Sequence, residues 1–229
     1  MRREEVIERL EWHFPELWAL TLCFAAWIAL IMHSFAHQHH TGALGSWWHW
    51  NLMVAAMMLP LKIDGIRLVA ERSLWTRRHQ AVMGYLLGYL SIWASVGALM
   101  AWACAQLDIQ HRLDWMTGAS IGFLVLTTWM TSPWKANAAS ACHWTMPLRP
   151  TGWNADTDCL CFGWIAGSTC VSNCWPMILL CWLSNHNFLI MCCAFGIGWT
   201  ERHSGIGLKS NAALAAVLAA IFGVSSFLR

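Results

Sequence analysis

The chain has 229 residues, of which 58% are apolar and only 11% are charged, and its mean hydropathy is positive. This composition is unusual for a soluble domain of that length and favours a protein whose helices lie in lipid. The formal net charge of +2 comes from basic residues scattered between apolar segments, which excludes a basic nucleic-acid-binding face. Eighteen Trp residues fit many helix ends at a membrane–water interface, where the indole ring is favoured.

The N-terminal residues 1–15 differ from the rest of the chain because charged and apolar side chains alternate there at helical spacing. This pattern predicts a short amphipathic helix on the inner leaflet of a membrane, ending at Pro15. No small-residue cleavage site comes after an apolar core of signal-peptide length, so we expect the first apolar helix to be retained. Residues 16–229 are expected to form a single transmembrane domain.

Seven apolar segments are long enough, or nearly so, to cross the hydrocarbon core of a bilayer. They predict an all-α, polytopic bundle of about seven transmembrane helices. The second carries Pro60, Lys62 and Asp64, and the sixth is short, so both are expected to face the bundle interior, where neighbouring helices satisfy polar groups. The segments are 17–36, 47–66, 81–105, 116–134, 160–183, 187–200 and 211–228.

The Lys and Arg residues predict the orientation of this bundle. With seven helices, twelve of the fourteen positive residues fall on the side that holds the N-terminus, and only Arg112 and Arg229 fall on the other. Positive residues accumulate on the cytoplasmic side of membrane proteins. We therefore expect a multi-pass protein of a bacterial inner membrane with its N-terminus in the cytoplasm.

Cysteines in the fifth segment are the most specific chemical signal. Cys170, Cys174 and Cys181 are separated by four and seven residues, which places their thiols on one helical face. Pro176 lies in the same helix and predicts a kink beside Cys174. Further thiols are expected at the cytoplasmic end of this helix and in the adjacent loop: Cys142, Cys159 and Cys161.

Thioethers and imidazoles add to this set of soft donors. Met53 and Met57 lie one turn apart in the second segment, and with thiolates they favour monovalent copper, with zinc as the alternative metal. His33, His37, His49 and His186 are expected at the outer ends of their helices, where imidazoles bind copper or zinc. Outer histidines, inner Met and Cys residues and a cytoplasmic Cys cluster would form a graded path for a soft metal.

Several enzyme classes lack their motifs in this sequence. No C-x-x-C occurs, which disfavours a membrane thiol oxidoreductase. No phosphate-binding glycine loop, nucleotide fingerprint or serine nucleophile elbow is present either. A non-enzymatic role is therefore favoured.

The stretches WNLMVAAMMLP, residues 50–60, and 170–187 resemble a bacterial family of predicted metal-binding integral membrane proteins, domain-of-unknown-function family 2182. The similarity covers about residues 47–205, and Asn173 and His186 stand where that family has cysteine and methionine. A cysteine-rich loop of the family is matched in part by Lys135, Cys142 and His143. The resemblance implies metal binding, and its motif residues here are Ala56, Met57, Met58, Leu59, Pro60, Cys170, Val171, Ser172, Asn173, Cys174, Trp175, Asn187, Glu201 and Arg202.

These patterns lead to two functions from different classes. The first is a membrane protein that binds copper through a Cys, Met and His site and delivers it to an acceptor protein. The second is a non-catalytic accessory subunit of a larger membrane complex, such as a metalloenzyme, an electron-transfer assembly or a pigment assembly. Lipid surrounds the protein in both cases, and partner membrane subunits are required only by the second.

Overall fold

The computed structural model describes residues 14, 16–35, 43–107, 114–203 and 208–228. Helix is the only regular secondary structure in these ranges, which confirms the expected all-α class. The expected interfacial helix of residues 1–15 lies almost entirely outside the described residues, and His37 lies outside them as well.

The described chain falls into two compact units, and two long helices contribute to both. The first unit takes the described residues up to Ala98 together with Thr145–Ser168. Its helices are α2 (Leu17–Phe35), α3 (Ala43–Met57), the 3-10 turn η1 (Pro60–Lys62), α4 (Ile63–Arg72), the 3-10 turn η2 (Trp75–Arg77), and the first parts of α5 (Arg78–Leu107) and α9 (Trp153–Leu183).

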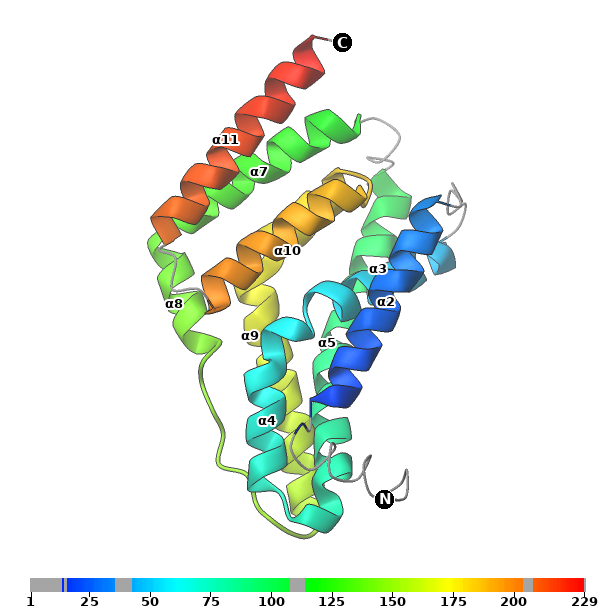
Figure 1. Ribbon diagram of the computed structural model, residues 1–229, viewed down its shortest axis with the longest axis vertical. Helices are drawn as coiled ribbons and strands as arrows, with labels where there is room; N and C mark the ends of the chain where they lie inside the picture. Colours follow the sequence, from blue (N-terminus) through cyan, green and yellow to red (C-terminus); the bar gives the residue numbers. More distant parts are fainter. Residues whose placement is uncertain (1–13, 15, 36–42, 108–113, 204–207, 229) are drawn as a thin grey trace, which may run out of the picture. The chain divides into compact units, whose positions relative to one another are not determined.

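The second unit takes Leu99–Trp144 and the described residues from Thr169 onward. It contains the remaining parts of α5 and α9. Its other helices are α7 (Trp115–Thr131), α8 (Pro133–Ala141), α10 (Phe188–His203) and α11 (Leu208–Phe227) (Figure 1).

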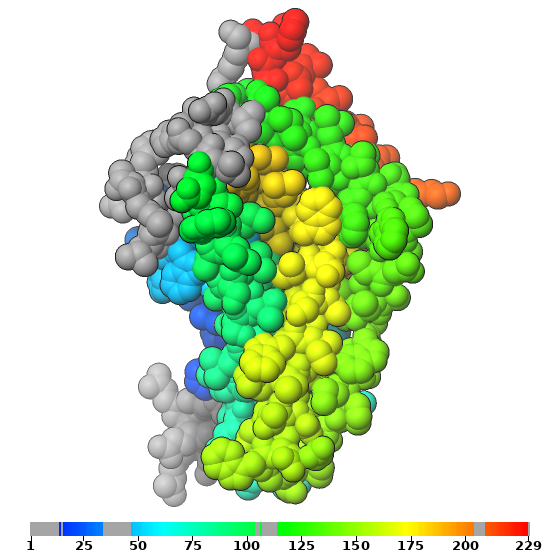
Figure 2. All heavy atoms as spheres, turned by 180° about the vertical axis from the view of Figure 1, so that it is seen from behind, coloured from blue at the N-terminus to red at the C-terminus, as the bar shows by residue number. Residues whose placement is uncertain are grey.

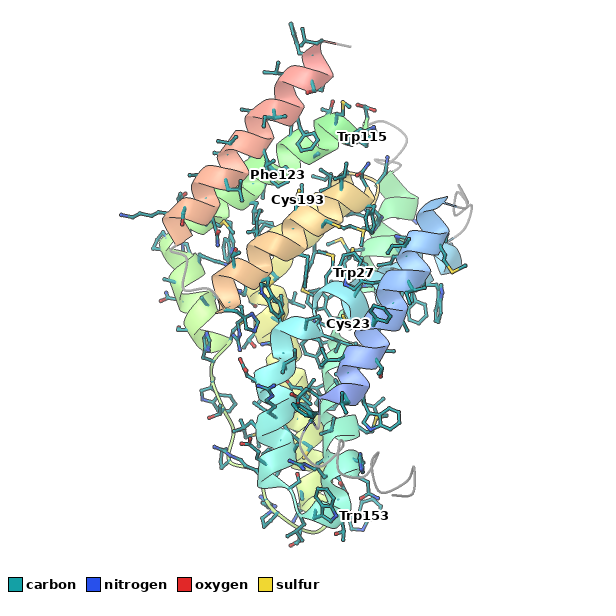
Figure 3. The ribbon with its side chains drawn as sticks, viewed as in Figure 1. Cys23, Trp27, Trp115, Phe123, Trp153 and Cys193 are labelled. Atoms are coloured by element: carbon teal, nitrogen blue, oxygen red, sulfur yellow. The ribbon has the colours of Figure 1, made fainter. Side chains whose placement is uncertain are left out.

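Helices α2 and α3 pack together in the first unit. The buried face of α2 shows helical periodicity through Ala19, Cys23, Ala26 and Leu30. The Cys23 thiol donates a hydrogen bond to the carbonyl oxygen of Ala56 on α3, at 3.3 Å. Figure 3 labels Cys23 on α2. Small side chains on this face allow the two helices to approach closely.

The apolar segment expected at 47–66 is divided in the structure. Helix α3 ends at Met57, η1 begins at Pro60, and α4 runs from Ile63 to Arg72. Proline has no N–H group and fixes its own φ, so it ends a helix or begins a new one. The segment is therefore two helices joined by a buried 3-10 turn, and the expected single span over these residues is wrong in that respect.

Helices α5 and α9 are in close backbone contact in the first unit. A Cβ atom added at Gly88 would overlap the carbonyl oxygen of Leu160, and one added at Gly163 would overlap that of Tyr85. These parts of α5 and α9 lie side by side in the lower half of Figure 2. Glycine is required at both positions because no side chain fits between the helices.

Helices α7 and α11 form the main helix pair of the second unit and run alongside each other in Figure 1. The rings of Phe123 and Phe222 stack with their centroids 5.8 Å apart. The Ser120 hydroxyl donates to the carbonyl oxygen of Ala219 at 3.1 Å. These contacts hold the Ala-rich C-terminal helix α11 against α7.

Three helical stretches of the described chain are long and apolar enough to cross a membrane. They are Trp75–Ala103, Trp153–Leu183 and Lys209–Phe227, and Leu17–His33 is a shorter apolar helix. Length and composition support these candidate spans.

Candidate functional site

Three cysteines lie on one buried face of α9 in the second unit. Cys170, Cys174 and Cys181 are all nearly inaccessible to solvent. Cys170 and Cys174 lie one helical turn apart with their side chains near each other, and we call these two residues the thiol pair. Cys181 lies about 10 Å further along the helix axis, at 1.5 Å per residue, so it cannot bind the same ion as the pair in a regular helix.

The backbone next to the thiol pair is held by side chains from other helices. Pro176 removes one hydrogen bond of α9, in the turn after Cys174. The carbonyl oxygen of Asn173 accepts hydrogen bonds from Trp129 Nε1 at 3.2 Å and from Lys135 Nζ at 3.3 Å. The Asn173 amide donates to the Cys174 sulfur at 3.6 Å. Asn173 thus links the thiol pair to α7 and α8.

A buried ion pair lies beside these groups. Lys135 Nζ on α8 is 2.7 Å from Glu201 Oε1 on α10, and the two side chains are 0% and 14% exposed. Both charges act on the Cys174 thiol. The other carboxylate oxygen of Glu201 is buried and has no hydrogen-bond partner among the described residues. Buried lysines are rare, because removing a charge from water is costly unless it is paired.

The C-terminal end of α8 approaches the same turn of α9. The Cys142 thiol donates to the carbonyl oxygen of Thr169, which precedes Cys170 in sequence, at 3.3 Å. The neighbouring His143 has its Nε2 atom 3.3 Å from Arg202 Nη1. Arginine can only donate, so the His143 nitrogen is the acceptor in this contact. A third sulfur and an imidazole therefore lie near the ends of α8 and α10, in the same unit as the thiol pair.

A different group of soft donors lies in the first unit, between α2 and α3. The rings of His33 and His49 have centroids 5.2 Å apart and planes tilted by 59°. His49, Met53 and Met57 are spaced at intervals of four residues, and both thioethers are buried. We call His33, His49, Met53 and Met57 the imidazole–thioether group.

The remaining predicted donors belong to neither the thiol pair nor the imidazole–thioether group. Cys159 and Cys161 lie on the part of α9 that belongs to the first unit, the former buried and the latter half-buried. His186 comes after α9 in the left-handed region with a φ of 54°, and its N–H donates to the carbonyl oxygen of Cys181 at 2.8 Å. Nowhere in the described ranges do three His, Cys, Asp or Glu side chains gather to hold a metal ion.

Three residues beside the thiol pair were not identified from the residue pattern alone. In the sequence, Lys135 and Glu201 stand out only through the family resemblance, and Asn173 as a departure from it. Each belongs to the polar cluster next to Cys174. An ionisable residue next to an apolar segment is a usable signal, since such residues in membrane proteins commonly mark functional sites.

The fold and these side chains define a helical protein with apolar segments long enough to span a membrane and two groups of residues of the types that bind soft metals. The model of a protein family described as PpoB2, a copper chaperone, matches residues 47–225. This match covers well over half of the chain, so the protein belongs to this copper chaperone family. No curated protein and no solved structure matches the chain.

Membership of this family supports copper binding or delivery, and with it a metal acceptor protein as the partner. It also agrees with the resemblance seen in the sequence in one respect: both families handle metals. The matched range includes the thiol pair, Lys135, Glu201, His49, Met53 and Met57.

Proposed function

We propose that this chain is a multi-pass membrane copper chaperone that holds monovalent copper at the thiol pair and passes it to an acceptor protein. The observation that carries this proposal is the position of the Cys170 and Cys174 thiols, one turn apart on the buried face of α9. Thiolates are soft ligands and select monovalent copper over harder cations.

The number of donors at the thiol pair suits this cargo. A monovalent copper ion needs only two thiolates, whereas a structural zinc ion takes four ligands. Two thiols one turn apart, with a third sulfur on Cys142 near the same turn of α9, fit the smaller requirement. A low number of ligands also suits delivery, because an acceptor can add its own ligand before the ion leaves.

The imidazole–thioether group is proposed as a second, weaker holding point. Imidazoles and thioethers are neutral ligands, so they bind copper without losing protons. The contact between the rings of His33 and His49 supports this proposal. His37 is proposed as a further imidazole of this group on its helical spacing from His33 in the sequence.

We further propose the topology predicted from the sequence: about seven transmembrane helices in a bacterial inner membrane, with the N-terminus in the cytoplasm. The three candidate spans and the one-sided distribution of Lys and Arg support this arrangement. The motif residues shared with domain-of-unknown-function family 2182 also support membership of that family. We keep four further residues as proposed metal donors: Cys159, Cys161, Cys181 and His186.

The test is elemental analysis of the full chain, purified in mild detergent after loading with monovalent copper. The double substitution Cys170→Ser and Cys174→Ser is compared with a matched control, Cys192→Ser and Cys193→Ser, which changes two half-buried cysteines of α10. We expect about one copper ion per chain in the wild type and the control, and none above background in the thiol-pair variant.

Each result has a defined meaning. Equal copper in the wild type and the thiol-pair variant would refute the assignment of the cargo site. An empty wild-type protein that copurifies with partner subunits in fixed ratio would favour the accessory-subunit function instead. Zinc in place of copper would overturn the proposed metal.

A further inference from the structure

The side chain of Asn173 faces one sulfur of the thiol pair. Its amide nitrogen Nδ2 lies 3.6 Å from the Cys174 sulfur and donates a hydrogen bond to it. The backbone of Asn173 is fixed at this point, because its carbonyl oxygen accepts from Trp129 Nε1 at 3.2 Å and from Lys135 Nζ at 3.3 Å. Two helices, α7 and α8, therefore hold the residue whose amide contacts the sulfur.

The oxygen of the same amide gains nothing from this position. Asn173 Oδ1 is buried and has no hydrogen-bond partner among the described residues. A buried polar atom without a partner lowers the stability of a fold. The bond from Nδ2 to a protonated thiol offsets little of this cost, because such a sulfur is a weak acceptor. The contact with a ligand sulfur, rather than packing, is thus what an asparagine provides here.

Copper binding strengthens the contact between this amide and the sulfur. When Cys174 binds copper it loses its proton, so its sulfur becomes a charged acceptor and can no longer donate. Only the N–H side of an amide is complementary to such a sulfur, and hydrogen bonds to charged groups are stronger than neutral ones. A sulfur that shares a lone pair with an N–H group donates less electron density to its metal. The amide therefore weakens the bond between copper and Cys174.

We propose that Asn173 is a positioning residue for copper transfer, whose amide hydrogen bond makes Cys174 easier to displace by a ligand of the acceptor. This inference rests on the proposed function, because it takes the thiol pair as the cargo site. In the transfer step, the acceptor ligand forms a bond to copper and the bond between copper and Cys174 breaks. The electron pair stays on the Cys174 sulfur, which takes up a proton from solvent, and copper remains monovalent throughout.

The experiment measures how fast the full chain, loaded with copper(I) in detergent, gives its ion to excess bicinchoninate, a coloured copper(I) chelator. Asn173→Leu keeps a side chain of similar size and removes the donor. We expect the rate constant of release to fall by about three- to tenfold, which corresponds to the loss of one modest hydrogen bond. Asn173→Gln keeps an amide and is expected to restore part of the release rate.

Asn211→Leu is the matched control, because Asn211 is a buried asparagine of the same unit. Its Oδ1 atom accepts from the Thr200 hydroxyl at 3.3 Å, and its Nδ2 atom is buried without a partner in the described part of the chain. This substitution should leave the release rate unchanged.

A purely structural role of Asn173 predicts the opposite sign. Asn173→Leu would then unfold more easily and release copper faster than the wild type. The proposal predicts slower release together with a free energy of unfolding that equals or exceeds that of the wild type, because the substitution removes an unpaired buried oxygen. Should this variant not fold, Asn173→Ala removes the same donor, and slower release is again the expected result.

The outcomes separate this inference from the proposed function. Release from the Asn173 variants at the wild-type rate or faster overturns the inference. If Cys170→Ser with Cys174→Ser loses its copper in the same series, the proposed function stands without it. If wild-type protein binds no copper(I), the proposed function fails and the inference fails with it.

Discussion

The two units of this protein present soft donors in different electrostatic surroundings. In the first unit, His33 and His49 bring two imidazole rings together, and the thioethers of Met53 and Met57 on α3 are buried. In the second, the thiol pair lies beside the charges of Lys135 and Glu201. Both arrangements suit a soft metal, and in the second a buried ion pair lies beside the ligands.

This difference arises from the chemistry of the ligands. Imidazole and thioether ligands stay neutral when they bind a metal, so the charge of the complex is that of the ion. Thiolates bring negative charge into a region from which water is excluded, and such charge needs a partner. The comparison therefore predicts a weaker, exchangeable site in the first unit and a tighter site in the second.

The largest expected effect is the loss of tightly held copper. In Cys170→Ser with Cys174→Ser, we expect the copper retained after dialysis to fall below about one tenth of the wild-type amount, because serine hydroxyls are poor ligands for monovalent copper. Plasma mass spectrometry of the dialysed protein measures this. Retention at the wild-type level would show that the second unit is not the tight site.

The second-largest effect is expected on the free energy of unfolding, when a buried ion pair is broken. Glu201→Gln leaves the ammonium group of Lys135 buried without its counter-charge, and we expect a loss of about 3–5 kcal/mol in unfolding free energy. Glu16→Gln is the comparison in the first unit, because its partner Arg67 is 52% exposed and can be solvated by water. We expect that substitution to cost only about 1 kcal/mol.

Thermal or denaturant unfolding in one detergent, with both variants measured side by side, checks this order. If Glu16→Gln lowered the free energy of unfolding as much as Glu201→Gln, the burial of Lys135 would not make its ion pair more important for stability than the exposed pair.

Close helix packing in the first unit gives a smaller effect. Gly88→Ala inserts a methyl group where the carbonyl oxygen of Leu160 lies, and overpacking of this kind costs about 1–3 kcal/mol. Gly196→Ala is the control, since its added Cβ meets no atom within 4 Å. The control should be neutral or slightly stabilising in a helix. If the unfolding curves of the two variants coincided, the described contact between α5 and α9 would be contradicted.

The smallest effect is expected in the imidazole–thioether group. Replacing His33 and His49 by Phe removes the imidazole nitrogens but preserves planar rings, so the tight site should keep its copper. We expect the overall copper(I) affinity to change by less than about tenfold, or ~1.4 kcal/mol. Competition titration measures this, and a larger loss would make the first unit the principal site.

Much of the fold could be predicted from the sequence, because apolar segments of membrane-spanning length leave few alternatives to helix. Each of the seven expected segments contains helix in the described chain. The division at Pro60 was not predicted, although a proline cannot continue the hydrogen bonds of a helix. The compact units, by contrast, depend on long-range packing, such as the fit of Gly163 against Tyr85, that no periodicity encodes.

Less of the candidate site could be predicted. The spacing of Cys170 and Cys174 places both on one face of any helix, so their proximity is a result of local geometry. The ion pair of Lys135 and Glu201 could not be predicted in this way, because 66 residues separate position 135 from position 201. The two side chains meet only when α8 and α10 both pack near α9. Periodicity within one helix carries no information on such a contact.

The central claim is that copper is held by the thiol pair, and X-ray absorption spectroscopy at the copper edge tests it most directly. The full chain, loaded with monovalent copper in detergent, should show a shell of two sulfur ligands that disappears in the variant Cys170→Ser with Cys174→Ser. A shell dominated by nitrogen, unchanged in that variant, would contradict the account and move the cargo site to the histidines of the first unit.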